Sequence, residues 1–551
     1  MNSPWFKHYP KGIPYEINPD QYISLLEVFE ECFSKFADLP AFVNMDKTIT
    51  FKELDELSKR FASYLQNVAQ LKQGEKIAIQ MPNLLQYPVA LFGALRAGLV
   101  VVNTNPLYTP REMEYQYKDS EATAIVIVAN FANNLETIIG QTRIKTIIVT
   151  EIGDLLGFKG IIVNAAVKYL KKMVPSYILP AHLKFKDVLK EGDPSKYKKP
   201  YLTGTDLAFL QYTGGTTGVS KGAMLTHRNM VANMLQMSAW MIPKLKDKEE
   251  IVITPLPMYH IFSLTVNCLG MLKIGAKNIL ITNPRDMKAF IKELKKYPFT
   301  VITGVNTLYN GLINQEDFKN LDFSKLKVAV GGGMAVQRVV AEKWAKITGT
   351  PIVEGYGLTE TAPVVNCNPI DGTERLGYIG IPVPSTDVKI MDEGGNEVPV
   401  GTPGEICVKG PQVMLGYFQK EAETKNVFKD GWFKTGDIGE INEDGYFRIV
   451  DRIKDMIVVS GFKVFPNEVE DVMAAHPGVL EVAAIGIPDE KSTETVKLFV
   501  VKKDPSLTEE DLKEYAKKNL TSYKRPKYYE FRKDLPKSNV GKIIRRQLRT
   551  P

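Results

Sequence analysis

The stretch YTGGTTGVSKG, residues 212–222, follows directly on the apolar run LAFLQ and is rich in glycine and threonine. Its glycines free the backbone to direct N–H groups inward, and its hydroxyls and single lysine add donors and positive charge. We therefore expect a phosphate-binding loop, with a glycine-rich turn that holds no ligand as the alternative. The residues of this loop are Thr213, Gly214, Gly215, Thr216, Thr217, Gly218, Ser220 and Lys221.

This loop is not a Walker A motif. That motif reads G-x-x-x-x-G-K-[ST], and its final hydroxyl holds Mg²⁺. Here Ser220 precedes Lys221 and Gly222 follows it. The glycine before the lysine and the Ser or Thr hydroxyl after it, which would bind Mg²⁺, are therefore both missing. The chemistry of a phosphate site remains, without that particular loop.

Short β-branched runs alternate with helical patterns on both sides of the loop. Helical stretches such as DMKAFIKELKKY separate the runs. Buried strands that alternate with helices predict parallel sheets of the α/β class. YPVALFGALRAGLVVVN, residues 87–103, is predicted as a buried helix followed by a strand. The apolar runs are KIAIQMP, AIVIVAN, TIIVT, IVITPLP, NILITNP, TVITGV and KVAVGGG.

The sequence pattern changes after about Arg375. From there it is rich in turn residues and has short stretches that alternate apolar and polar residues, which predicts a β-rich part over residues 376–450. A small α+β unit follows. We predict a large N-terminal domain, residues 1–453, and a small mobile C-terminal lid domain, residues 454–551, that is hinged at Lys454.

Size and composition exclude several classes of protein. A chain of 551 residues is long enough for several domains, since single cores stop growing at ~250–300 residues. The net charge of +7 is small for this length. The sequence has no arginine-rich arm and no Cys/His spacing typical of a zinc site, so it gives no indication of nucleic-acid binding. The four cysteines are scattered, which is typical of a reducing compartment. We expect no signal peptide and no membrane-spanning segment.

Three further motifs carry groups that suit a nucleotide. VGGGMAV, residues 330–336, lets the backbone approach a flat ligand closely. EGYGLTET supplies an aromatic face at Tyr356, a hydroxyl at Thr359 and a carboxylate at Glu360, which suits Mg²⁺ beside a phosphate loop. GWFKTGDIG supplies Asp437 for ribose hydroxyls. Each motif alone is more often a plain turn.

In this order, however, the motifs resemble those of the adenylate-forming enzymes: acyl-CoA synthetases, peptide-synthetase adenylation domains and luciferases. The motifs that carry the resemblance are YTGGTTGVSKG, PLPMYHIF, GYGLTET, GEICVKG, WFKTGDIG, DRIKDMIVVSGFKVFPNEVE and PKSNVGKIIRR. They extend over nearly the whole chain. Residues 430–455 look like a fatty-acyl-CoA synthetase signature, and several other stretches are similar to bacterial long-chain fatty-acid–CoA ligases.

The resemblance implies a two-step reaction. A long-chain fatty acid attacks the α-phosphate of Mg²⁺-bound ATP, and coenzyme A then displaces AMP from the acyl-adenylate. Both nucleophiles belong to substrates, so catalysis rests on positioning and charge stabilisation.

The resemblance also implies residue roles. The loop 213–221 wraps the β- and γ-phosphates, Glu360 and Thr213 hold Mg²⁺, and Thr359 contacts the α-phosphate. His260 lies beside the acyl carboxylate, although a histidine alone is more often a core residue. The residues implied for the nucleoside are Gly333, Gly355, Tyr356, Asp437 and Arg452.

Lys542, in SNVGKIIRR, is implied to bridge the substrate carboxylate and the α-phosphate. Without the family pattern, a lysine in a basic tail is a solvated surface charge. We expect Lys542 to serve adenylation only. Rotation about Lys454 then replaces it with the VVSGFKV face, whose Gly461 lines the coenzyme A tunnel.

Acyl length is open at this point, because HIFSLTVNCLGMLKIG and TGVNTLYNGL are equally well tunnel walls or ordinary core. A medium-chain ligase, a fatty-acyl-AMP ligase and a peptide-synthetase-type adenylation domain are alternatives. A non-enzymatic lipid-binding protein attached to a membrane is less favoured.

The segment FKGIIVNAAVKYLKKMVPSYILP, residues 158–180, is apolar and carries four lysines but no acid. It is either a surface helix with a solvated lysine face, which we favour slightly, or a helix that lies on an anionic membrane. The family resemblance implies a cytoplasmic homodimer in peripheral contact with the inner membrane.

Overall fold

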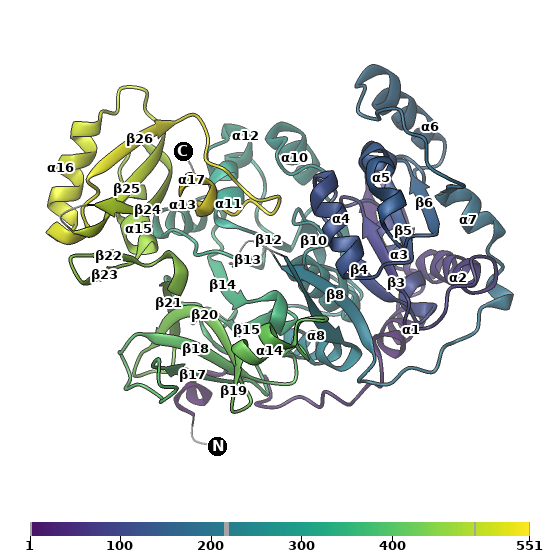
Figure 1. Cartoon of the computed structure of the whole chain (residues 1–551), viewed down its shortest axis with the longest axis horizontal. Coiled ribbons are helices and arrows are strands. Elements are labelled where there is room, and N and C mark those ends of the chain that lie inside the picture. The colour runs from purple at the N-terminus through teal and green to yellow at the C-terminus, as the bar shows by residue number, and fades with distance from the viewer. Residues whose placement is uncertain (1–2, 214–219, 490–491, 550–551) are drawn as a thin grey trace.

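The computed structural model describes residues 3–213, 220–489 and 492–549 (Figure 1). The loop residues Gly214, Gly215, Thr216, Thr217 and Gly218 lie outside this described part. Within it, no helix combines the length and the apolar character that crossing a bilayer requires.

In a seven-stranded sheet, strand β8 ends at the start of the predicted phosphate-binding loop, residues 213–221, which we call the glycine-threonine loop. All neighbouring strands are parallel except β9, which runs antiparallel to β8. Across the sheet the order is β7 (Leu183–Lys184), β6 (Thr146–Thr150), β5 (Ala124–Val128), β3 (Lys76–Gln80), β4 (Val100–Asn103), β8 (Leu207–Thr213) and β9 (Lys221–Thr226).

A nine-stranded sheet carries the other glycine-rich motifs. Its six central strands are parallel, so the carboxyl ends of β12, β13 and β14 meet at one edge. Across the sheet the order is β16 (Ile381–Pro382), β15 (Val364–Cys367), β14 (Ile352–Gly357), β13 (Val328–Gly332), β12 (Val301–Gly304), β10 (Ile251–Thr254), β11 (Lys277–Leu280), β1 (Pro40–Asn44) and β2 (Lys47–Thr50). The predicted α/β class with parallel sheets is confirmed.

Helices surround and separate the two sheets (Figure 1). Every residue of α3 is buried, as expected for the helix in residues 87–103. The helices of this part are α1 (Leu25–Lys35), α2 (Phe51–Asn67), α3 (Gln86–Arg96), α4 (Pro110–Asp119), α5 (Ala132–Ile138), α6 (Phe158–Ala165), α7 (Phe185–Glu191), α8 (His227–Met241), α9 (Met271–Lys273), α10 (Met287–Leu294), α11 (Asn306–Ile313), α12 (Glu316–Lys319) and α13 (Arg338–Thr348). Two π-helical segments, η4 (Ala166–Leu170) and η6 (Ser263–Gly270), extend this set.

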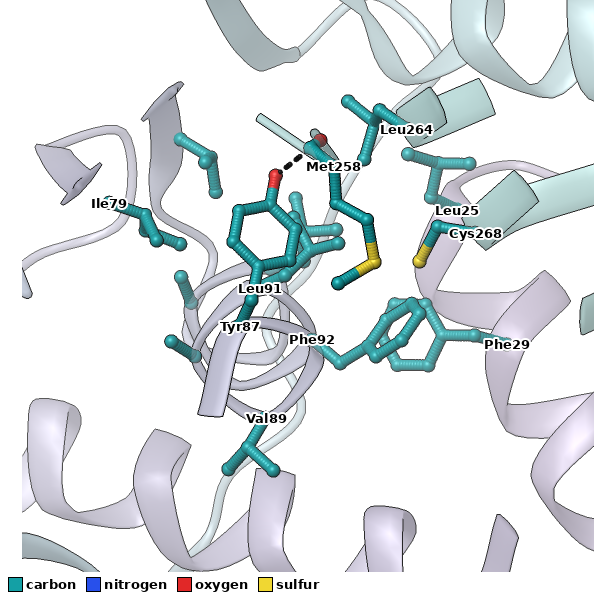
Figure 2. Close-up of a cluster of buried hydrophobic side chains, with 14 of the residues drawn as sticks. Leu25, Phe29, Ile79, Tyr87, Val89, Leu91, Phe92, Met258, Leu264 and Cys268 are labelled. Atoms are coloured by element: carbon teal, nitrogen blue, oxygen red, sulfur yellow. Dashed lines mark hydrogen bonds between the residues drawn. The ribbon is translucent and has the colours of Figure 1, made fainter. Parts of the chain in front are cut away.

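The core around α3 holds the segment that follows β10 in place. Figure 2 shows Tyr87 Oη donating to the carbonyl of Met258 at 2.8 Å. Phe92, one turn further along α3, packs on Phe29 with ring centroids 4.9 Å apart. Met258 lies two residues before His260, so burial of apolar side chains positions that histidine.

The predicted β-rich part is an antiparallel sheet. Its strands are β17 (Asp387–Met391), β18 (Gly404–Lys409), β19 (Phe428–Lys429), β20 (Trp432–Ile441) and β21 (Phe447–Arg452), with α14 (Glu421–Val427) beside them. Residues 381–382, at the start of the range, instead extend the nine-stranded sheet as β16.

The small C-terminal domain is a five-stranded sheet with helices, as predicted. Its elements are β22 (Ile457–Val459), β23 (Phe462–Val464), α15 (Pro466–Ala474), β24 (Val479–Asp489), β25 (Thr493–Lys502), α16 (Glu509–Asn519), β26 (Tyr528–Arg532) and α17 (Arg545–Arg549). Lys454 lies in the 3-10 turn η8 (Ile453–Asp455) between β21 and β22. Other 3-10 turns are η1 (Pro4–His8), η2 (Ala129–Phe131), η3 (Ile139–Gln141), η5 (Pro194–Lys196) and η9 (Ser522–Lys524).

Candidate functional site

The glycines at the end of β13 leave room for two functional side chains. A Cβ built on Gly332 would lie 3.0 Å from the ring of Phe262, and one on Gly333 would lie 3.0 Å from Cε of Lys542. Gly333 also has a φ of +79°, a conformation that side chains disfavour. Glycine at these positions therefore lets Lys542 approach the backbone at this sheet edge.

Lys542 comes from the C-terminal domain, and its neighbour anchors it on the large domain. Thr307 Oγ1, in α11, donates to the carbonyl of Gly541 at 2.8 Å, where the C-terminal chain passes beside α11 (Figure 1). Ser538 accepts from the Lys542 N–H at 3.1 Å through Oγ. Gly541 has a φ of +80°, and a Cβ there would come within 2.7 Å of Thr307 Oγ1. The turn thus holds the lysine at the site edge.

Burial and neighbouring charges set the protonation of Lys542. Burial, and after it the positive charge of Arg452, lower its pKa to about 8. Asp437 and Glu360 oppose this shift. Arg452 and Asp437, implied for the ribose, and Glu360, implied for the metal, therefore all influence the pKa of Lys542.

His260 lies in the field of Lys542. Burial, followed by the charge of Lys542, lowers its pKa to about 3, so the imidazole is neutral near pH 7. The Phe262 N–H donates to Nδ1 of His260 at 3.3 Å. The proton therefore resides on Nε2, which is free to donate to an anionic oxygen.

A second group joins the end of β14 to the β-rich part. Tyr356 Oη donates to Asp437 Oδ2 at 2.7 Å, and Arg452 Nε lies 3.1 Å from Asp437 Oδ1. Asp437 and Arg452 are direct cross-strand neighbours on β20 and β21. Gly355, before Tyr356, has no atom within 3.7 Å of a built Cβ. An aromatic ring, a carboxylate and a guanidinium thus meet, a set of groups that suits the base and ribose of a nucleoside.

Glu360 is held by a tyrosine that the sequence reasoning missed. Tyr417 Oη donates to Glu360 Oε1 at 2.8 Å, and Lys221 Nζ lies 4.8 Å from the centre of the Tyr417 ring. Residues 415–418 hydrogen-bond along β9, which brings Tyr417 beside Lys221. Its signal in the sequence was only its place in the stretch PQVMLGYFQKEAET.

Glu360 fits a magnesium ligand. Burial raises its pKa, and it forms no ion pair with any cation among the described residues. Within the described ranges no group of three or more His, Cys, Asp or Glu side chains could hold a metal by itself. Mg²⁺ commonly binds through one or two carboxylates together with substrate phosphates, which a single buried carboxylate suits.

Both ends of the glycine-threonine loop are described. Thr213 ends β8 and lies opposite Lys221, the first residue of β9. Ser220 Oγ donates to the carbonyl of Thr213 at 2.6 Å, which closes the base of the loop. Thr359 opens the 3-10 turn η7 (Thr359–Thr361) that also carries Glu360.

Two predicted residues lie outside this group. Gly461, with a φ of +83°, forms the turn between β22 and β23, and a Cβ there would meet nothing within 4 Å. Lys454 is exposed between the domains. The two predicted acyl walls fall on η6 and α9 and on the end of β12 and α11; they are mostly buried, and Thr303 Oγ1 donates to Asn267 Oδ1 at 3.0 Å between them.

Comparisons with known proteins match the chain along its length. The AMP-binding enzyme family profile matches residues 29–418, and that of the AMP-binding enzyme C-terminal domain matches residues 468–542. A protein from Escherichia coli O6:H1 named long-chain-fatty-acid–CoA ligase is 58% identical over 550 residues, covering 100% of this chain and 98% of that protein. A protein of the same name from Haemophilus influenzae is 52% identical, with coverage of 100% and 98%.

A solved structure agrees with the sequence matches. ATP-bound MatB from Rhodopseudomonas palustris superimposes with a TM-score of 0.76 at 29% identity, covering 95% of this chain and 98% of that one. The match includes both the large and the small domain. The chain belongs to the family of AMP-binding enzymes.

Proposed function

We propose that this chain is an AMP-forming ligase that converts long-chain fatty acids to acyl-CoA. The observation that carries the proposal is the position of Lys542, next to Gly333 and within the field of His260, Asp437 and Glu360. Relatives named long-chain-fatty-acid–CoA ligase, 52–58% identical over the full chain, support the substrate class.

In the first step a carboxylate oxygen of the fatty acid attacks the α-phosphorus of ATP. The bond to pyrophosphate breaks, and the acyl-adenylate forms. Two anions must approach each other, which costs electrostatic energy. In this proposal the Lys542 ammonium and the Nε2–H of neutral His260 offset this cost, which their proximity and the neutral state of His260 support.

In the second step the coenzyme A thiolate attacks the acyl carbon. The C–O bond to AMP breaks, and the thiol proton goes to solvent. No residue of this chain forms a covalent bond in either step, so positioning dominates catalysis.

The nucleotide has a continuous set of partners in this proposal. Tyr356 and Gly355 hold the adenine, Asp437 and Arg452 hold the ribose, and Thr359 contacts the α-phosphate. Thr213, Ser220 and Lys221, with the loop residues between them, hold the outer phosphates. Glu360, with Thr213, holds Mg²⁺, which neutralises phosphate charge when it is bound.

The test is AMP release from ATP by the purified chain with Mg²⁺, across saturated acids from acetate to stearate. We expect turnover that requires coenzyme A and is highest for long acids. A maximum at medium chains would identify a medium-chain ligase. Pyrophosphate release with accumulation of acyl-AMP, and neither thioester nor AMP formed when coenzyme A is present, would identify an acyl-AMP ligase.

Lys542→Ala separates the two steps. We expect acyl-AMP formation to fall by about 10²-fold or more, because one charge-stabilising donor is lost. Thioester formation from supplied acyl-AMP should stay near the wild-type rate. Equal loss in both half-reactions would contradict the assignment of Lys542 to adenylation.

Two parts of the proposal rest on the family resemblance alone. These are a homodimer and peripheral contact with the cytoplasmic face of a membrane. Sedimentation equilibrium measures the first, and the surface that would make the second is argued below.

A further inference from the structure

Helix α6 packs its polar side against the protein. Gly160 crosses Gly153 so closely that a Cβ on Gly160 would lie 1.9 Å from the Gly153 carbonyl oxygen. Asn164, one turn on, accepts from the Gly153 N–H at 2.7 Å and donates to Glu151 Oε2 at 3.0 Å. Apart from Val163, which packs against the core, the inward face is therefore small and polar, unlike that of an ordinary surface helix.

The outward side of the same segment is apolar. Seven of the nineteen exposed large hydrophobic side chains in the described residues lie between Phe158 and Ile178. Phe158 is 79% exposed, Leu170 82% and Ile178 83%. We call residues 158–178 the α6 surface; its exposed apolar side chains are Phe158, Ile161, Ile162, Tyr169, Leu170, Met173 and Ile178. Such a concentration marks an interaction site rather than scattered exposure.

The charge around the α6 surface is positive. Between Asp154 and Asp187 the sequence has six lysines and no acid. Lys159 is paired with Asp46 at 2.7 Å, whereas Lys168, Lys171 and Lys172 are exposed and make no ion pair with any described acid. Two carboxylates that contact this segment are already engaged, since Glu136 accepts from the Ile178 N–H and Glu151 from Asn164.

We propose that the α6 surface docks on a membrane that contains anionic lipid, with its apolar side chains among the acyl chains and its free lysines at the headgroups. An apolar face flanked by lysines is the composition that lies in such an interface. A second copy of this chain fits less well, because a symmetric contact would bring two sets of free lysines together. Helix α6 stands at the outer end of the molecule, away from the C-terminal domain (Figure 1). This inference does not depend on the ligase activity.

Vesicle flotation of the full chain without ATP tests the proposal. The probes are vesicles of phosphatidylcholine with phosphatidylglycerol and vesicles of phosphatidylcholine alone. We expect binding to the anionic vesicles, and Phe158→Ser/Leu170→Ser should lower the partition coefficient by at least about tenfold. Lys168→Gln/Lys171→Gln should remove most of the preference for anionic lipid.

Matched controls place the same changes elsewhere. Tyr201→Ser/Val400→Ser alters two other exposed apolar residues, and Lys346→Gln/Lys518→Gln alters two other exposed lysines without ion pairs among the described residues. Both controls should bind like wild type. Absence of wild-type binding, or equal losses in test and control variants, would overturn the proposal.

A labelled variant gives a second readout that does not rely on loss of binding. All four native cysteines are buried, so Ile162→Cys offers one accessible thiol for a polarity-sensitive fluorophore. Its emission should shift to the blue when anionic vesicles are added. A blue shift that needs only higher protein concentration, together with a dimer mass that Phe158→Ser/Leu170→Ser abolishes, would instead identify a self-association surface and contradict the membrane assignment.

Discussion

Lys542 and His260 lie close enough for the charge of one to oppose protonation of the other. The lysine must be charged to stabilise two approaching anions, and its pKa of about 8 leaves it protonated below that pH. The histidine, with a pKa of about 3, is a hydrogen-bond donor that does not change state near neutrality. The site therefore has one titrating cation in the physiological range.

This pair predicts the pH profile of adenylation. For kcat/KM with fatty acid, we expect a plateau near neutral pH and a fall of about tenfold per unit above the Lys542 pKa, since free enzyme then loses the required proton. The measurement is single-turnover pyrophosphate release in the absence of coenzyme A, with the rate taken as a function of fatty-acid concentration. An acid limb at about pH 6.5, the ordinary histidine value, would mean that His260 titrates in the site and would contradict its neutral assignment.

Glu354 predicts a pH dependence of stability that is separate from catalysis. It is 6% exposed on β14, and Val336 N–H donates to its Oε2 at 3.1 Å. Burial raises its pKa to about 7 from 4.5. Folding therefore favours the protonated acid, a contribution that is fully present below pH 4.5 and is lost as pH rises through about 7.

Glu354→Gln keeps the acceptor and removes the titration. We expect the difference in free energy of unfolding, variant minus wild type, to increase with pH by up to about 3 kcal/mol in total, because only the wild type loses stability as Glu354 ionises. Thermal midpoints of both proteins at acid and alkaline pH measure this difference. Glu443→Gln, at an exposed residue, is the control and should show none. A constant difference at every pH would mean that folding does not raise the pKa of Glu354.

At the scale of elements, local patterns were sufficient for the strands. All seven apolar runs found in the sequence are strands of the two parallel sheets, because continuous burial selects β-branched residues there. The glycines of VGGGMAV, at the end of β13, likewise indicated close approach of the backbone to a ligand. The partners of the site residues could not be predicted, because they are remote in sequence. Tyr356 and Asp437 are 81 residues apart, and Tyr417 and Glu360 are 57 apart.

Helix α17 clamps the two sides of the predicted hinge. Arg545 lies 2.7 Å from Glu470 of α15 and 3.3 Å from Asp451 of β21, and Arg549 lies 3.0 Å from Asp455. Asp451 is fully buried, and burial raises its pKa to about 6, so it is ionised at neutral pH. A short helix of five residues thereby joins the large domain to the small one three residues after Lys542.

Arg545→Gln tests this clamp. It leaves two carboxylates without their main cation, so we expect a loss of about 3–5 kcal/mol in stability where the domains meet. Acyl-AMP formation should fall more than thioester formation, because the clamp supports the arrangement that holds Lys542 in the site. Arg525→Gln, at an arginine that donates only to backbone carbonyls within the C-terminal domain, is the control. Parallel loss of both steps in Arg545→Gln would show a purely structural role.

At the scale of the whole molecule, one arrangement of the domains serves only one of the two proposed steps. Lys542 occupies the site, and Gly461, which we predict to line the coenzyme A tunnel, forms a turn with nothing within 4 Å of its Cβ position. The proposed reaction therefore needs the small domain to rotate between steps. The contacts that would have to break include Thr307 with Gly541, Arg545 with Asp451, and Asn310, whose side chain donates to the Leu480 carbonyl at 2.9 Å.

Lys454→Pro tests whether that rotation occurs at the predicted boundary. Residue 454 is the second of the 3-10 turn η8, where an N–H has no acceptor inside the turn, so proline removes no hydrogen bond of the turn, although it also restricts Ile453 before it. Proline fixes φ, and we expect acyl-AMP formation to stay within about threefold of wild type while thioester formation falls by at least about 10²-fold. Lys454→Ala removes the same side chain but leaves φ free, and it should retain both steps. If thioester formation survives in Lys454→Pro, the domains do not turn about residue 454, and the hinge must lie elsewhere between β21 and β22.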